Sequence, residues 1–265
     1  MGRDLSHWGG GVMGLEAVFD LSGRRALVTG AGTGLGRGFA RTLALAGASV
    51  TLAGRRREPL ESCAQEIRSA GGVAHWVQMD VASAESVANA FGQVGPIDVL
   101  VNNAGVAGVG ALLELTEESW DGVLNINLKG AWLVARAAAR GMMERGGSGS
   151  IVNVASVLGC AVQKGTGSYP AAKAALLHLT RQMALEWAKY GIRVNAIAPG
   201  YFASELSGGY LASEGGKAMV KRMPLRRVGE PGELDGALLL LASGASSFMT
   251  GSVITVDGGL SVPSV

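Results

Sequence analysis

The stretch ALVTGAGTGLG, residues 26–36, decides the fold class. A short apolar run leads directly into a glycine-rich turn, and a helical pattern follows over residues 37–46. Glycines allow a tight turn and let the backbone approach a ligand without intervening Cβ atoms. The free N–H groups and the positive dipole end of the following helix suit a diphosphate. The stretch therefore predicts a dinucleotide-binding turn, with candidate contacts at Gly30, Thr33, Gly34, Leu35 and Gly36.

A glycine-rich turn that binds nothing is the alternative interpretation of the same letters. Its position after the first strand and before a helix favours the dinucleotide. A phosphate-binding loop of the Walker type is excluded, because no Gly-Lys-Ser or Gly-Lys-Thr follows the turn.

The rest of the chain alternates short apolar runs with longer helical patterns. Strands are predicted at residues 25–29, 49–53, 73–79, 97–101, 150–155, 193–198 and 253–256, and helices at residues 37–46, 58–70, 83–91, 120–144, 169–190 and 231–242. Apolar runs without strict alternation indicate strands that are buried on both faces, as in a parallel sheet. We predict one α/β domain over residues 20–265, a Rossmann-type doubly wound sheet with helices on both faces. Residues 1–19 are glycine-rich and are expected to form a loose arm.

The composition excludes several classes of protein. The chain has 265 residues, of which 48% are apolar, and a net charge of +2, so it is neither disordered nor a basic nucleic-acid-binding protein. Cys63 and Cys160 are too few for a disulfide framework or a four-ligand zinc site, and we predict no metal. The N-terminal residues lack the apolar segment of a signal peptide, and the charge-free run 236–256 is too polar to span a membrane. We expect a soluble, cytoplasmic protein without a membrane partner.

The end of the second predicted strand carries the signal for the choice of cofactor. An acidic residue at this point would bind the ribose 2′-hydroxyl of NAD. Here the stretch reads LAGRRR, residues 52–57, and contains no carboxylate. An arginine can pair with the 2′-phosphate of NADP, so we expect NADP rather than NAD, with Arg55 as the main contact. Three solvated arginines are the alternative, although cations at a helix start oppose the helix dipole.

A tyrosine and a lysine are placed for proton transfer. Tyr169 and Lys173 are four residues apart at the start of a helical pattern, so both project from one face, and Pro170 suits the first turn of a helix. An ammonium nearby would favour the phenolate of a tyrosine whose ordinary pKa is about 10. Such a tyrosine could exchange a proton with a carbonyl or alcohol oxygen. Ser156 ends the predicted strand 150–155, where its hydroxyl could hold that oxygen. Taken alone, each of these residues is also typical of an ordinary surface pair or strand end.

Together these motifs resemble the short-chain dehydrogenase/reductase family over residues 20–260. The matching elements are TGAGTGLG at 29–36, Asp80-Val81, NNAG at 102–105, Asn127, Ser156, YPAAK at 169–173, Pro199-Gly200 and VDGG at 256–259. The resemblance implies a sheet of seven parallel strands and the reversible, NAD(P)-dependent interconversion of a secondary alcohol and a ketone. Two positions depart from the family pattern. Pro170 stands where a small residue is usual, and Thr33 stands where some NADP-preferring members carry a basic residue.

The same resemblance implies a role for each matching residue. Tyr169 would be the general acid/base, Ser156 would position the substrate oxygen, and Lys173 would lower the tyrosine pKa and bind the nicotinamide ribose. Asn127 would anchor a water that relays protons to Lys173. The remaining positions would contact the cofactor: Asp80 and Val81 at the adenine, Asn102, Asn103, Ala104 and Gly105 beside the adenosine half, and Pro199, Gly200, Phe202 and Ser204 at the carboxamide.

The substrate should be recognised by residues 158–168 and by a lid at residues 201–222, because loops after the strand ends shape the pocket. The stretches PGYFASEL, residues 199–206, and LAGRR, residues 52–56, are similar to sugar-acid dehydrogenases of the gluconate type and to 3-oxoacyl-carrier-protein reductases. Lys164, Lys217 and Arg222 are candidates to bind a substrate carboxylate or phosphate.

We expect a small carbonyl or alcohol substrate. A 3-oxoacyl-carrier-protein reductase and a non-catalytic NADP-binding sensor are the alternatives, and the intact serine, tyrosine and lysine set argues against the sensor. The charged fraction of 17% indicates covered surface, and the family commonly forms tetramers. We therefore expect a homotetramer that associates through residues 120–144, 169–190 and 252–256.

Overall fold

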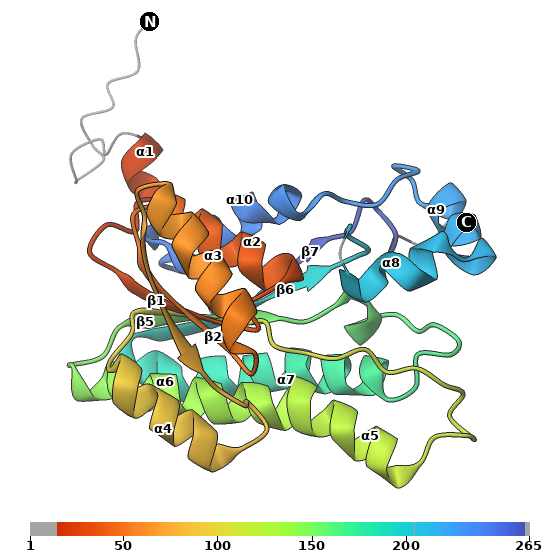
Figure 1. Ribbon diagram of the computed structural model, residues 1–265, viewed down its shortest axis with the longest axis horizontal. Coiled ribbons are helices and arrows are strands. Elements are labelled where there is room, and N and C mark those ends of the chain that lie inside the picture. The colour runs from red at the N-terminus through yellow and green to blue at the C-terminus, as the bar shows by residue number, and fades with distance from the viewer. Residues whose placement is uncertain (1–14, 204, 263–265) are drawn as a thin grey trace, which may run out of the picture.

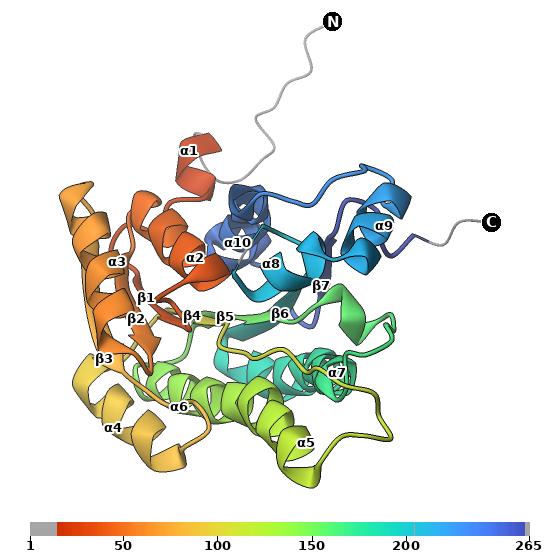
Figure 2. The ribbon, with the colours of Figure 1, turned by 45° about the vertical axis from the view of Figure 1, so that its right-hand side comes forward.

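The computed structural model describes residues 15–203 and 205–262. Its centre is a seven-stranded parallel sheet with the order β3-β2-β1-β4-β5-β6-β7 (Figure 2). The strands are β1 Arg25–Thr29, β2 Ser49–Gly54, β3 Val73–Gln78, β4 Val99–Asn102, β5 Gly149–Val154, β6 Ile192–Pro199 and β7 Val253–Val256. The order reverses between β1 and β4, which opens a crevice at the carboxyl ends of these strands. The predicted doubly wound sheet is confirmed, with strand ends shifted by no more than two residues.

Two layers of helices cover the sheet (Figures 1 and 2). One layer contains α2 Gly34–Leu45, α3 Arg57–Ser69 and α10 Asp235–Ala242, and the other contains α4 Ala84–Val94, α6 Ala131–Glu144 and α7 Tyr169–Trp187. Successive residues of β1 pack into opposite layers: Val28 lies in the core with Phe39 of α2, and Leu27 lies in the core with Val134 of α6. Because both faces are buried, the centre of the strand, residues 26–28, is apolar and does not alternate.

The helix predicted at residues 120–144 is present, begins at residue 117 and contains one π-helical turn. Its segments are α5 Glu117–Leu124, a π-helical turn Asn125–Gly130 and α6. Inside the wide turn, the amide of Asn127 donates to the carbonyl of Val123 at 3.0 Å and to that of Val106 at 3.0 Å. A helical residue is thereby tied to the loop after β4, which is why the regular helix is broken at this point.

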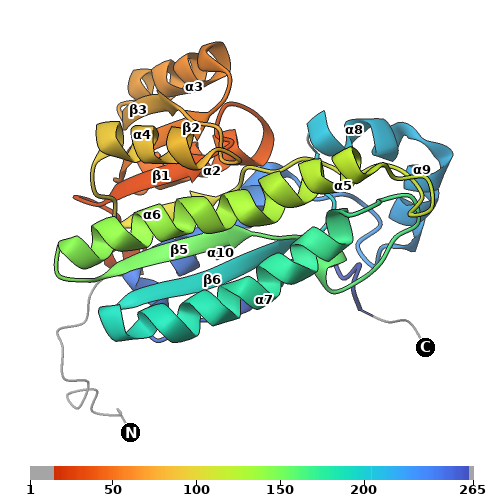
Figure 3. The same cartoon turned by 90° about the horizontal axis from the view of Figure 1, so that it is seen from below.

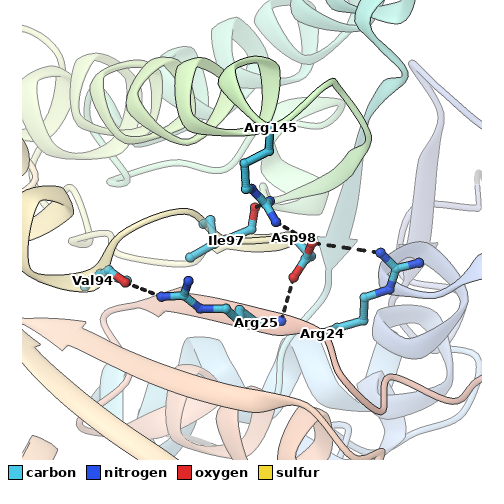
Figure 4. A network of polar contacts seen from close by, with 6 residues as sticks. All are labelled: Arg24, Arg25, Val94, Ile97, Asp98 and Arg145. Carbon is cyan, nitrogen blue, oxygen red and sulfur yellow. Dashed lines mark hydrogen bonds and ion pairs between the residues drawn. The ribbon is translucent and has the colours of Figure 1, made fainter.

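The amino ends of β1 and β4 are held by a cluster around Asp98 (Figure 4). Its carboxylate accepts from the backbone N–H of Arg25 at 2.8 Å and from the guanidinium of Arg145 at 3.1 Å, while Arg24 lies 3.9 Å away. Arg145 also donates to the carbonyl of Ile97. This cluster ties the end of α6 to the two central strands, at the edge of the sheet opposite to the crevice.

The predicted lid is helical. Residues 201–222 contain α8 Glu205–Ala212 and α9 Glu214–Arg222, which lie with α5 at the end of the molecule beyond the carboxyl ends of the strands (Figures 1 and 3). The last residues of the predicted N-terminal arm form one helical turn, α1 Leu15–Val18. Within residues 15–203 and 205–262, no helix has the length and apolar character needed to cross a membrane.

Candidate active site

The glycine turn after β1 forms the floor of a cavity of about 480 Å³. Gly34 has a φ of +54°, a conformation that favours glycine. A Cβ at Gly36 would lie 2.3 Å from the carbonyl oxygen of Gly30 and 2.5 Å from Nδ2 of Asn103, so no larger residue fits there. In the described chain, the side chain of Thr33 does not cap α2, and the first turn of that helix has no acidic residue. The N–H groups of this turn therefore remain available to an anion such as a diphosphate.

The NNAG segment is fastened to the glycine turn. The hydroxyl of Thr29 accepts from the backbone N–H groups of Asn103 at 3.0 Å and Ala104 at 2.9 Å. In return, Nδ2 of Asn103 donates to the carbonyls of Thr29 at 3.0 Å and Gly30 at 3.3 Å. The walls of the cavity on β1 and β4 are thus fixed relative to each other. The lining includes the predicted Gly30, Thr33, Gly34, Leu35, Arg55, Asp80, Val81, Asn103, Ala104 and Gly105.

Two of the three consecutive arginines face this cavity. Arg55 and Arg56 both line it, and within the described residues neither has a carboxylate at ion-pair distance. Arg57 instead pairs with Glu61 at 2.9 Å and lies over the ring of Trp76. The adjoining carboxylate of Asp80 accepts from the backbone N–H of Ala82 at 3.0 Å. A glycine cradle beside two unpaired cations fits the diphosphate and 2′-phosphate of NADP.

Asn102 differs from the expectation that it flanks the cofactor with its side chain. Its Nδ2 donates to the carbonyl of Ala131 at 3.0 Å and to Oδ1 of Asn153 at 3.1 Å, and Asn153 donates to Thr180 at 2.9 Å. The side chain is buried and does not line the cavity. Alternate residues of a strand point to opposite faces, so Asn103 points to the cofactor cavity and Asn102 points into the core between β4 and α6.

A second cavity of about 480 Å³ adjoins the first. Leu35, Asn103 and Gly105 line both cavities, which therefore form one continuous crevice. The predicted Ser156, Tyr169, Lys173, Pro199, Gly200 and Phe202 line the second cavity, and so does Asn127. Gly36 lines neither cavity and acts through close packing, and Ser204 lies outside the described residues.

Ser156 and Tyr169 meet although they are 13 positions apart in the chain. Ser156 follows β5 in an extended conformation, and its hydroxyl accepts from the backbone N–H of Leu158 at 3.1 Å. Tyr169 is the first residue of α7, and its side chain lines the same cavity as Ser156. Burial raises the pKa of Tyr169, and the interaction with Ser156 offsets part of that rise. Without a ligand, the phenol is therefore held in its neutral, proton-donating form.

Lys173 lies behind the tyrosine and is buried. Its Nζ donates to the carbonyl of Val154 at 2.8 Å and stands 5.5 Å from the centre of the Tyr169 ring. Burial lowers the pKa of Lys173 to about 8. Burial of the phenol is the largest influence on the Tyr169 pKa and raises it, so it outweighs the lowering that we expect from this ammonium.

Asn127 has no spare donor, because both of its N–H bonds are used within the chain. Its Oδ1 also accepts from the backbone N–H of Val106 at 3.3 Å. A Cβ at Gly105 would lie 2.5 Å from that oxygen and 3.7 Å from Nζ of Lys173, so glycine lets this loop pass close to both side chains. The amide of Asn127 thus holds the loop after β4 against the π-helical turn and beside Lys173.

The chain was compared with known proteins. A family model described as enoyl-(acyl carrier protein) reductase matches residues 30–261. Gluconate 5-dehydrogenase of Gluconobacter oxydans is 40% identical over 250 residues, which cover 92% of this chain and 97% of that protein. Cis-4-hydroxycyclohexanecarboxylate dehydrogenase of Sinomonas cyclohexanicum is 44% identical over 241 residues, which cover 89% of this chain and 96% of the relative. The chain belongs to the short-chain dehydrogenase/reductase family.

A solved structure agrees with this assignment. Gluconate 5-dehydrogenase from Burkholderia cenocepacia, in complex with NADP and tartrate, has a TM-score of 0.90 and 39% identity, and the match covers 94% of this chain and 99% of that one. The short-chain dehydrogenase/reductase described here is accordingly an oxidoreductase that acts on CH–OH donors.

The substrate segments of this short-chain dehydrogenase/reductase enter the second cavity only in part. Of the three predicted cations, Lys164 lines the cavity, whereas Lys217 and Arg222 are exposed on α9 and do not. Lys217 pairs with Glu214 at 2.8 Å.

Several residues that line the crevice were not predicted as site residues, among them Arg56, Gln163, Tyr201 and Tyr210. Gln163, Tyr201 and Tyr210 fall within the predicted substrate segments, which is the only signal that the sequence carried for them. Among the residues that the structure describes, no group of three or more His, Cys, Asp or Glu side chains could hold a metal ion.

Proposed function

We propose that this protein catalyses the NADP(H)-dependent interconversion of a secondary alcohol and a ketone, with Tyr169 as the general acid/base. One observation carries the proposal. Tyr169 and Ser156 line the same cavity, with Lys173 beside the tyrosine ring, and that cavity is continuous with the glycine cradle. A substrate bound there has a proton donor on one side and the position of the cofactor on the other.

Each side chain has a defined task in this scheme. NADPH, when bound, supplies the hydride for the substrate carbon. Ser156 donates to the carbonyl oxygen and orients it, and Tyr169 releases its phenolic proton to that oxygen as negative charge develops there. In the alcohol-to-ketone direction the proton returns to Tyr169. Lys173 is protonated at pH 7, and its buried positive charge stabilises the phenolate that remains after proton transfer. Asn127 positions the loop that covers Lys173, and we propose that it also takes part in holding the water that returns protons.

The choice of NADP rests on the two arginines. Arg55 and Arg56 have no carboxylate partner within the described residues, so a dianionic phosphate can pair with both. Two related structures of 38% identity contain bound NADP, one named as a gluconate 5-dehydrogenase and the other as a 2-deoxy-D-gluconate 3-dehydrogenase. Asp80 and Val81 are proposed to frame the adenine, while Pro199, Gly200 and Phe202, together with Ser204, are proposed to meet the carboxamide.

The substrate class is proposed from the relatives and from the size of the cavity. By their names, three of the similar proteins act on gluconate, on 2-dehydro-3-deoxy-D-gluconate and on a hydroxycyclohexanecarboxylate, and two others act on galactitol and L-xylulose. A cavity of about 480 Å³ suits a compact molecule of this kind. We therefore propose a sugar acid or a similarly small hydroxy acid, and its keto form, as the substrate pair.

The assembly is proposed to be a cytoplasmic homotetramer. Exposed apolar side chains support contacts through α6 and α7: Trp132 is 36% exposed and Leu185 is 78% exposed. The edge strand β7 is half-exposed along its length and could pair with a second copy. Light scattering of the purified protein tests this part, since a monomer at micromolar concentration would contradict it.

The loss of NADPH absorbance tests the activity itself. We expect turnover of small keto acids, measured against neutral ketones of the same size and against a 3-oxoacyl thioester. Exclusive turnover of the thioester would favour the carrier-protein reductase. NADPH binding without turnover of any carbonyl compound would favour a sensor and would contradict the proposal.

A further inference from the structure

The loop between β5 and α7 brings two consecutive polar side chains, Gln163 and Lys164, to the wall of the second cavity. Within the described residues, Lys164 has no carboxylate at ion-pair distance, and Nε2 of Gln163 donates to no protein acceptor. No Asp or Glu from the described part of the chain lines this cavity, whose charged lining residues are Lys164 and Lys173. The cavity is therefore a positively charged chamber with unused donors, and such a chamber favours an anionic ligand.

The loop that carries these donors is held in place. The hydroxyl of Thr166 donates to the carbonyl of Gln163 at 2.7 Å, which closes a turn around Gly165, whose φ is +75°. The carbonyl of Gly165 accepts from the backbone N–H of Gly110 at 3.1 Å. The backbone N–H of Tyr169 donates to the carbonyl of Thr166 at 3.2 Å. The backbone that carries the two donors is therefore held relative to the proposed acid/base, which lowers the entropy lost when they bind a ligand.

Tyr201 orients the amide of Gln163. Its hydroxyl donates to Oε1 of Gln163, and its ring packs against the ring of Tyr210 on α8, with the centres 5.5 Å apart. Because Oε1 is engaged with this hydroxyl, the N–H bonds of Nε2 are turned to other partners. All three side chains line the cavity, so the lid and the loop after β5 meet there.

We infer that Gln163 and Lys164 together bind a carboxylate of the substrate, so that this site selects hydroxy acids and keto acids over neutral alcohols and ketones. The inference rests on the proposed function and specifies its substrate class. A cation and a neighbouring amide donor can each supply a hydrogen bond to one oxygen of a carboxylate. Tyr201 is a positioning residue that acts through Gln163.

Two ligands that cannot react separate binding from catalysis. Cyclohexanecarboxylate and its neutral analogue cyclohexanecarboxamide have the same shape and differ in charge. Their affinities for the NADP-loaded protein are measured by calorimetry in the wild-type protein and in the variants Lys164→Met, Gln163→Leu and Tyr201→Phe. Lys217→Met is the matched control, since Lys217 is also a predicted carboxylate-binding lysine but pairs with Glu214 and does not line the cavity.

We expect the wild-type protein to prefer the carboxylate at least tenfold. Lys164→Met should weaken carboxylate binding about 10–100-fold, in line with the loss of a hydrogen bond to a charged group. Gln163→Leu should weaken carboxylate binding about 5–10-fold. Adding Tyr201→Phe to the Gln163→Leu variant should not weaken carboxylate binding further. Carboxamide binding should stay within twofold throughout, and Lys217→Met should match the wild type.

The same comparison is repeated with reacting substrates, 4-oxocyclohexanecarboxylate and its carboxamide, with NADPH. A rise in KM for the acid alone, with kcat retained, supports the carboxylate site. The carboxylate site is overturned if the wild type binds acid and amide equally well or does not bind the acid. It is also overturned if Lys164→Met binds the acid as tightly as the wild type. Failure of the proposed function gives a different result from failure of the carboxylate site, because neither carbonyl compound would then be reduced although NADPH binds.

Discussion

The ammonium of Lys173 lies over the face of the Tyr169 ring, 5.5 Å from its centre. The two side chains project from one face of α7 because they are one helical turn apart. The ammonium is held there by the carbonyl of Val154 at the end of β5, the strand that also leads to Ser156. One strand end and the first turn of one helix thus determine the relative positions of the proton donor, the cation and the hydroxyl that orients the substrate.

Replacing Tyr169 by Phe should remove the proton transfer and leave the ring in place. Because general acid/base catalysis contributes about 10²–10⁴-fold, we expect kcat to fall by that factor. NADPH binding, followed by cofactor fluorescence, should weaken far less than kcat. Tyr190→Phe, at the far end of the helical segment, is the control and should keep full activity. Unchanged turnover in Tyr169→Phe would contradict the role of the phenol.

Replacing Lys173 by Met should make the protein more stable at pH 7 and inactive. Burial lowers the pKa of Lys173 from 10.5 to about 8, so the unfolded chain binds more protons than the folded one between these pH values. The burial penalty is therefore fully present below pH 8 and fades as the pH rises to 10.5. The wild type should gain about 2 kcal/mol of unfolding free energy relative to Lys173→Met between pH 8 and pH 10. Denaturant unfolding of both proteins measures the unfolding free energy at each pH. If the free energies of the two proteins change in parallel with pH, the lysine is not buried as described.

Replacing Arg55 by Asp should change the cofactor preference. The carboxylate would repel the 2′-phosphate and could accept from a ribose hydroxyl, so KM for NADPH should rise about 10–100-fold while KM for NADH stays similar or falls. Arg56→Ala should weaken NADPH binding by a smaller factor. Arg57→Ala is a control within the same tract, because Arg57 pairs with Glu61 and does not line the cavity. An unchanged ratio of the two KM values in Arg55→Asp would count against the assignment.

Two glycines of α2 provide a matched pair for the cradle. In Gly36→Ala the new methyl group would meet the carbonyl of Gly30 at 2.3 Å, and the fold must shift to admit it. We expect about 1–3 kcal/mol of destabilisation together with weaker NADPH binding. In Gly38→Ala the methyl group meets no atom within 4 Å, and alanine should stabilise the helix by about 0.5–1 kcal/mol. Thermal unfolding compares the two, and similar shifts in both variants would disagree with the packing around Gly36.

The fold and the central chemistry followed from the sequence because they depend on short-range geometry. A strand, a glycine turn and a helix start within residues 26–36 define the cradle, and a spacing of four residues in a helix places Tyr169 and Lys173 on one face. The helix predicted over residues 120–144 is present, but its π-helical turn at Asn125–Gly130 was not predicted, because Asn127 bonds to Val106 on another segment, a contact that no helical periodicity reveals.

The sequence by itself determined the doubly wound sheet, the cofactor turn and the tyrosine–lysine pair. Only the tertiary structure decided which of several similar side chains face the crevice. Arg56 faces it whereas Arg57 is drawn to Glu61, Asn102 turns into the core, and Lys164 lines the cavity that Lys217 does not reach. It also paired Gln163 with Tyr201, 38 positions further along the chain. These outcomes depend on which distant segments pack together, and local pattern carries no information about a partner that the chain meets only after folding.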